Sequence, residues 1–99
     1  MDVTLLYFDG CPNWREAQTR LDEAARVAGR SDVVVTLIPV PTLEDAERVS
    51  FRGSPTILIN GADPFADANA PVGLACRVFP TPSGLRGAPT VEQLVAVLR

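Results

Sequence analysis

The chain has 99 residues, 46% of them hydrophobic, and a formal net charge of −3. This length allows one modest core, so we expect a single domain spanning residues 1–99. The acidic balance and scattered arginines exclude the clustered positive surface that nucleic acid binding requires. No apolar run reaches the roughly 18 residues of a membrane span, and the first residues lack a basic leader. We therefore expect a cytoplasmic protein without a membrane partner.

The chain contains no histidine and no lysine, and all nine of its basic residues are arginine. These absences exclude a cysteine–histidine dyad, a Schiff-base lysine and a zinc site built from histidine. Two cysteines alone cannot complete a four-ligand structural metal site. We therefore expect neither a bound metal nor a cofactor, and the remaining nucleophiles are thiols, hydroxyls and carboxylates.

The apolar pattern predicts four strands and three helices. Near-continuous apolar runs indicate buried strands, and apolar residues at helical spacing indicate helices packed on one side. Pro12 suits the first position of a helix, and two pairs, Thr42 with Asp45 and Thr90 with Gln93, have the spacing of a capping box. The predicted order is strand 3–8, helix 12–28, strand 32–38, helix 43–49, strand 56–59, strand 74–79 and helix 91–98.

Connections between these elements predict a mixed four-stranded sheet with helices on both faces. The first crossover helix makes strands 3–8 and 32–38 parallel neighbours. The Asn60–Gly61 turn makes strands 56–59 and 74–79 antiparallel partners. Residues 61–73 form a long irregular loop whose role stays open, and residues 80–89 are expected to be a second loop.

Two motifs, FDGCPNW at residues 8–14 and GSPTILING at residues 53–61, resemble the thioredoxin superfamily, as does the order of elements. The resemblance implies an α/β fold of the thioredoxin-like order β-α-β-α-β-β-α. It also implies a reactive thiol at the start of the first helix, which is Cys11. The chain departs from the redox-active members at Trp14, where they carry the second cysteine of a CxxC pair.

Cys11 directly precedes Pro12, so we place it at the N-cap of the first helix and expect it to be partly exposed. The helix dipole stabilises an anion there by typically ~0.3–1 kcal/mol, which favours a nucleophilic thiolate. The alternative interpretation is a small apolar cap residue, because buried free cysteine is common.

Cys76 is the other cysteine of the chain. The predicted hairpin register places it about opposite Leu58, which is roughly 10 Å from the reactive end of the sheet. A disulfide requires Cα atoms within about 7 Å. Two interpretations stay open. A different register makes Cys76 the resolving partner of Cys11, and the predicted register makes it a core residue on the face of Leu74 and Val78.

The resemblance also implies a cis peptide bond between Ser54 and Pro55. Such a bond turns the backbone of Ser54 toward Cys11, where its amide and carbonyl pair with an extended substrate. Pro12 and Trp14 flank the thiol, so the expected substrate-binding residues are Pro12, Trp14, Ser54 and Pro55. An aromatic residue on the apolar stripe of a helix fits the core equally well.

The leading hypothesis is a thiol–disulfide oxidoreductase-like protein that acts through Cys11 by a mixed-disulfide step. Cys76 or an external thiol such as glutathione would resolve that intermediate, and the partner would be a protein disulfide or a low-molecular-weight thiol. One alternative is a thioredoxin-fold binding module without turnover. Another is capture of a soft metal such as mercury by one or two thiolates.

Overall fold

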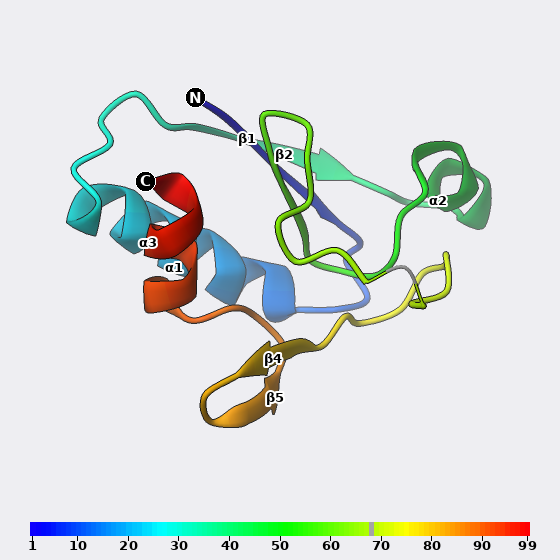
Figure 1. Ribbon diagram of the computed structural model, residues 1–99. Helices are drawn as coiled ribbons and strands as arrows, with labels where there is room; N and C mark the ends of the chain where they lie inside the picture. The colour runs from blue at the N-terminus through cyan, green and yellow to red at the C-terminus, as the bar shows by residue number, and fades with distance from the viewer. Residues whose placement is uncertain (68) are drawn as a thin grey trace.

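The computed structural model describes residues 1–67 and 69–99, and over these residues it has three helices and two small sheets (Figure 1). In chain order the elements are β1 (Asp2–Tyr7), α1 (Asn13–Val27), β2 (Val34–Pro39), α2 (Leu43–Val49), β3 (Thr56–Ile59), β4 (Phe79–Thr81), β5 (Gly84–Arg86) and α3 (Val91–Leu98). None of the described helices is long and apolar enough to cross a membrane.

The larger sheet has three strands in the order β2-β1-β3. β1 pairs with β2 in parallel and with β3 antiparallel, and Leu5 of β1 lies opposite Leu37 on one side and Ile57 on the other. The predicted parallel first pair is therefore confirmed. The sheet is mixed, as expected, but it has three strands instead of four.

Helices α1 and α3 lie on the same face of this sheet (Figure 1). Apolar residues at helical spacing on α1 meet those of α3 and the inward side chains of the sheet, and all are buried. The cluster includes Val3, Leu5, Ala17, Leu21, Ala24, Ile57, Leu94, Val95 and Leu98. Burial of this amphipathic surface holds both helices to the sheet.

A second, smaller cluster covers the opposite face of the sheet. Leu6 of β1 packs there with Val40, Ala46 of α2 and Phe51, which follows α2. Successive side chains of a strand point to opposite faces, so Leu5 and Leu6 belong to different clusters. The continuous apolar run of the first strand thus reflects burial on both faces, as predicted for a central strand.

Two predicted caps are present in the structure. The Thr90 side chain accepts the Gln93 N–H at 3.1 Å, and the Gln93 side chain accepts the Thr90 N–H at 2.9 Å, which completes a capping box. At α2, Thr42 Oγ1 accepts the Asp45 N–H at 3.1 Å. These bonds satisfy amides that have no partner inside a helix, and they fix where α2 and α3 begin.

The predicted strand 74–79 is wrong as a partner of β3. The Asn60–Gly61 turn forms, with φ angles of 50° and 85°, but among the described residues the chain after it pairs with β3 only through a bridge between Ile59 and Ala62. The chain then leaves the sheet, and β1 takes the antiparallel place beside β3. Residues 80–89, expected to be a loop, instead contribute to the β4–β5 hairpin.

The inward face of residues 74–79 is the reverse of the predicted one. Leu74, Cys76 and Val78 are exposed, whereas Arg77 and Phe79 are buried. Because side chains alternate along an extended chain, a shift of one residue exchanges the two faces. This inversion sends Arg77 into the interior and brings Cys76 to the surface.

Candidate active site around the Cys11–Cys76 disulfide

Cys11 and Cys76 form a disulfide across 65 residues of sequence, with their Cα atoms 5.6 Å apart. The predicted separation of roughly 10 Å was wrong because Cys76 does not lie opposite Leu58. It makes a parallel bridge to Ser54, two residues before β3 begins. This end of β3 is also where β1 delivers Cys11, since the two strands run antiparallel.

Cys11 lies between the end of β1 and the start of α1. Its N–H donates to the Phe8 carbonyl at 3.2 Å, which closes a turn after the strand. The N-cap of α1 is Pro12, so the predicted N-cap position of Cys11 was wrong by one residue. Cys11 is also fully buried, at 0% relative exposure, and the expected partial exposure was wrong.

Cys76 is the accessible end of the disulfide. It is exposed, in an extended segment without regular secondary structure, so the interpretation as a core cysteine was wrong. An external thiol meets Cys76 before it can meet Cys11. The two cysteines are therefore unequal, with Cys11 buried in the core and Cys76 exposed to solvent.

Ser54 connects the two cysteine-bearing segments. Its backbone N–H donates to Ala75 O at 2.8 Å, and its carbonyl accepts the Arg77 N–H at 2.9 Å. Cys11 Sγ lies 3.6 Å from the same carbonyl oxygen. The Ser54 hydroxyl accepts the Phe8 N–H at 3.3 Å, which ties it to the end of β1. The 75–77 segment of the same chain therefore occupies the backbone groups of Ser54 that were expected to bind a substrate, and that expectation was wrong.

The Ser54–Pro55 peptide bond is cis, and both residues are buried. They directly precede β3, and the backbone of Ser54 is paired with the 75–77 segment, so neither residue offers an open surface to a substrate. Pro12, by contrast, is exposed and adjoins Cys11. Three of the four predicted substrate-binding residues, Pro12, Ser54 and Pro55, therefore lie next to the cysteine pair, and of these three Pro12 is exposed.

Trp14 is partly buried at the edge of the main hydrophobic core. Its ring stacks on Tyr7 with a centroid distance of 4.3 Å, and the Arg15 guanidinium lies 5.2 Å from the ring centroid. It is partly buried against the cluster under α1. These contacts favour the core interpretation over a groove-lining role.

Arg77 anchors the segment that carries Cys76, and this role was not predicted from the sequence. Its guanidinium pairs with Asp63 at 2.7 Å, donates to the Phe65 carbonyl and lies 4.7 Å from the Phe79 ring centroid. The Arg77 side chain is only 6% exposed. A buried guanidinium requires such partners, so Asp63 is the reason that Arg77 can face inward. An arginine inside an alternating apolar run was the available signal.

Gly53 allows the 75–77 segment to pack closely against the turn before β3, and this role was also not predicted from the sequence. Its φ is +115°, and a Cβ built on it would lie 2.9 Å from Arg77 Cβ and 3.2 Å from the Ala75 carbonyl oxygen. Only glycine adopts this backbone angle readily and also allows so close an approach. The turn before β3 thus fits the 75–77 segment closely.

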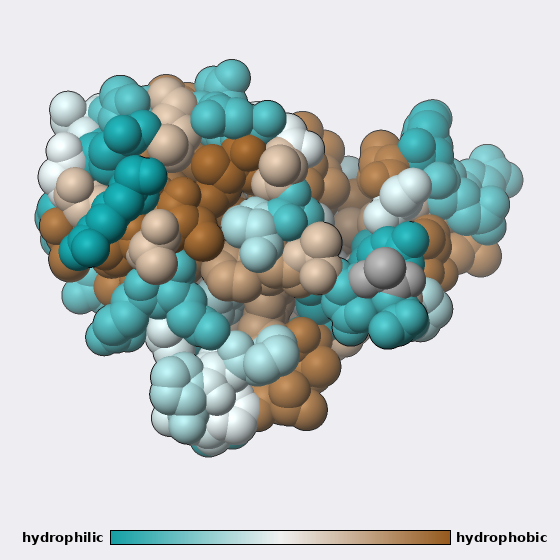
Figure 2. All heavy atoms as spheres, in the orientation of Figure 1, coloured by the Kyte–Doolittle hydropathy of each residue, from teal (hydrophilic) through white to brown (hydrophobic). Residues whose placement is uncertain are grey.

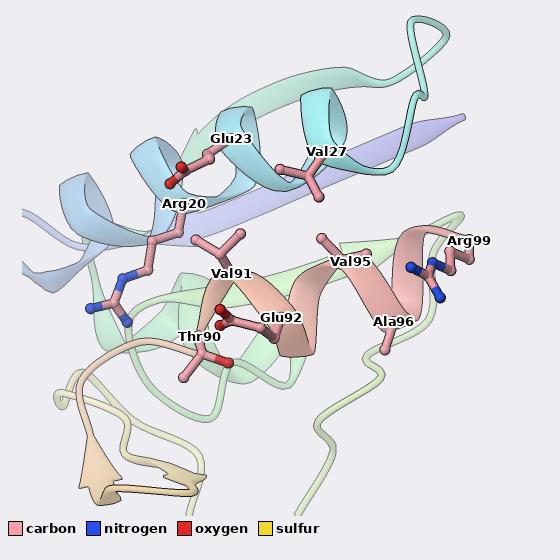
Figure 3. A pocket seen from close by; sticks show the side chains of 9 residues that line it. All are labelled: Arg20, Glu23, Val27, Thr90, Val91, Glu92, Val95, Ala96 and Arg99. Atoms are coloured by element: carbon pink, nitrogen blue, oxygen red, sulfur yellow. The ribbon is translucent and has the colours of Figure 1, made fainter.

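A cavity of about 470 Å³ opens beside the disulfide, and Cys76 is part of its lining together with side chains from residues 52–80. A second cavity, of about 680 Å³, lies between α1 and α3 and contains neither cysteine (Figure 3). Its lining includes the charged residues Arg20, Glu23, Glu92 and Arg99 beside Val27, Val91 and Val95. Of the two, the cavity beside Cys76 is the one with a cysteine in its lining.

Over the described part of the chain, no group of three or more histidine, cysteine, aspartate or glutamate side chains is placed to hold a metal ion. The comparisons with protein-family models, with curated proteins and with solved structures return no match to this chain. The thioredoxin superfamily therefore stays a prediction from the two motifs and the order of elements.

Proposed function

We propose that the protein carries out thiol–disulfide exchange through the Cys11–Cys76 pair. The observation that supports this proposal best is the asymmetry of the disulfide, in which Cys76 is exposed and Cys11 is fully buried. Exchange begins with attack of a thiolate on one sulfur of a disulfide, so access decides which sulfur is attacked. Here that sulfur is Cys76.

The proposed reaction has two steps. A substrate thiolate attacks Cys76 Sγ, a new sulfur–sulfur bond forms, and the Cys11–Cys76 bond breaks with its electron pair leaving on Cys11. The Cys11 thiolate takes a proton from water. A second substrate thiolate then attacks the substrate sulfur of the mixed disulfide and releases Cys76. The substrate loses two electrons as a disulfide, and the protein gains them as two thiols.

Ser54 is proposed to assist the buried thiol. Its carbonyl oxygen lies 3.6 Å from Cys11 Sγ, within reach of a weak S–H donor once the disulfide is open. Read in reverse, the same steps let Cys76 attack a substrate disulfide and let Cys11 resolve the mixed disulfide. Cys76 is thus the entry sulfur in both directions, and Cys11 is the internal partner.

We further propose the cytoplasm as the compartment. Disulfides that form in a reducing compartment are usually transient and catalytic or redox-sensing. An exchanging role fits that setting better than a permanent structural bond does.

A turnover assay tests this function. A peptide dithiol is mixed with an uncharged disulfide, bis(2-hydroxyethyl) disulfide, and a much smaller amount of the protein, and formation of the peptide disulfide is followed by chromatography. The wild type should accelerate the oxidation beyond the uncatalysed rate, and both Cys11→Ser and Cys76→Ser should remove the acceleration. Equal rates with and without wild-type protein would overturn the proposal.

A further inference from the structure

We infer that the cavity beside Cys76 is a subsite for an uncharged, apolar side chain next to the cysteine of a polypeptide substrate. This inference rests on the proposed function and names its substrate class. It distinguishes between the two partners that the sequence leaves open, a protein and a charged low-molecular-weight thiol.

The position of the cavity supports the inference first. Cys76 lines it directly, so a residue adjoining the attacking cysteine would reach it while the two sulfurs are in contact. Its volume of about 470 Å³ lies within the range of roughly 300–1,000 Å³ that is usual for ligand sites. An apolar side chain of ordinary size therefore fits beside the sulfur.

The lining is mainly apolar. Phe65, Pro71, Ala75, Val78 and Pro80 contribute to it. The two prolines have no backbone N–H, and hydrocarbon side chains offer no hydrogen-bond donor to a carboxylate. Binding to such a lining is favourable mainly because apolar surface of the ligand is removed from water, and a charged group has little apolar surface to bury.

The charged groups of the lining already have partners. The Arg77 guanidinium is engaged by Asp63 and the Phe65 carbonyl, and Arg52 donates to the Ala70 carbonyl. Asp67 adds a carboxylate to the same lining. Glutathione carries two carboxylates, which the Asp67 carboxylate would repel, and Asp63 already neutralises the Arg77 guanidinium. The arrangement favours an uncharged segment.

Apolar surface also continues outside the cavity. Val72, Leu74 and Val78 lie on the segment that carries Cys76 and are exposed, Val78 at 59%. Leu85 in the neighbouring hairpin is 62% exposed. Figure 2 shows apolar surface beside the β4–β5 hairpin, into which this segment runs. A polypeptide would find further apolar contacts on either side of its cysteine, whereas a small thiol would not.

The test uses the oxidised wild-type protein and two blocked peptides of equal length, each with a single cysteine. Leucines flank the cysteine in one peptide and serines flank it in the other. Opening of the Cys11–Cys76 disulfide is measured by acid quenching, alkylation and mass spectrometry. We expect the leucine peptide to open it about tenfold faster than the serine peptide and faster than glutathione, since burying one apolar side chain changes specificity by roughly 10–200-fold.

Two matched variants test whether the preference for leucine arises in the cavity beside Cys76. Val78→Asp places a carboxylate in the lining, and Val34→Asp makes the same change on β2 at a valine of nearly equal exposure, 61%. The preference for leucine should disappear in Val78→Asp and persist in Val34→Asp. Equal rates for both peptides with the wild type, or equal effects of the two variants, would overturn the subsite and leave exchange intact. If neither peptide opens the disulfide, the proposed function fails together with the subsite.

Discussion

The carbonyl oxygen of Ser54 accepts the backbone N–H of Arg77 at 2.9 Å, and this bond sets the register of the whole site. With the Ser54 N–H bonded to Ala75 O, it holds the 75–77 segment parallel to the start of β3. Cys76, between the two paired residues, then faces Cys11. The backbone pairing of Ser54 with Ala75 and Arg77 thus places Cys76 at the exposed side of the disulfide and Cys11 at the buried side.

The close approach at Gly53 gives the first prediction. Gly53→Ala would place a Cβ 2.9 Å from Arg77 Cβ at a φ of +115°, so the 75–77 segment must move. We expect the free energy of unfolding to fall by about 2–4 kcal/mol, from overpacking together with backbone strain. Urea denaturation measures the change.

Gly61→Ala is the matched control for this substitution. Gly61 also has a positive φ, +85°, but a Cβ there meets no atom within 4 Å. The Gly61→Ala protein should lose about 1 kcal/mol of unfolding free energy, which is the cost of the positive φ for alanine. A Gly53→Ala protein no less stable than Gly61→Ala would show that the segment does not press against the turn.

The Arg77–Asp63 ion pair gives the second prediction. Asp63→Ala leaves a guanidinium that is 6% exposed without its carboxylate, and we expect a loss of about 3–5 kcal/mol in unfolding free energy. The pair between Glu16 and Arg20 is the control, because the Glu16 side chain is 53% exposed and Arg20 also donates to the Pro89 carbonyl at 2.9 Å. Glu16→Ala should lose less than about 1 kcal/mol of unfolding free energy. Similar losses in the two variants would contradict the anchoring role of Asp63.

How much of this could be predicted from sequence depends on whether a feature is local. The helix caps at Thr42 and Thr90 were predictable, because a capping bond spans three residues and depends on their types alone. The burial of Leu5 and Leu6 on opposite faces followed from the apolar run. The end of α1 at Val27, followed by Gly29 with a φ of 68°, is equally local.

The placement of Cys76 was not predictable in this way. The alternating pattern of residues 74–79 fits two opposite phases, and hydrophobicity favours the one that exposes Arg77. The structure has the other phase because Asp63, 14 residues earlier, neutralises Arg77 in the interior. A contact between distant charged groups decides the phase, and no local pattern records it.

The third prediction concerns the contribution of the disulfide to the stability of the fold. It closes a loop of 65 residues, so its loss should lower the free energy of unfolding by about 2–4 kcal/mol. Cys76→Ser should match the reduced wild type in stability, since both lack the bond and residue 76 is exposed. Urea denaturation of the oxidised and reduced proteins makes the comparison. Coincident curves for the two wild-type forms would contradict it.

The fourth prediction is the order of thiol reactivity after reduction. Because Cys76 is exposed and Cys11 lies in the core, a brief pulse of iodoacetamide should label Cys76 first. Mass spectrometry of the digested protein gives the labelled fraction at each cysteine. The same pulse in urea should label both equally, which controls for intrinsic differences. Faster labelling of Cys11 in the folded protein would reverse the assigned roles.

The most direct measurement of the exchange mechanism is the site of the mixed disulfide. The reduced Cys11→Ser and Cys76→Ser proteins are each mixed with a peptide disulfide, quenched with acid and mapped by mass spectrometry. The mechanism predicts a stable adduct at Cys76 in Cys11→Ser, which lacks the resolving thiol, and little or no adduct at the buried Cys11 in Cys76→Ser. An adduct that forms only at Cys11 would contradict it.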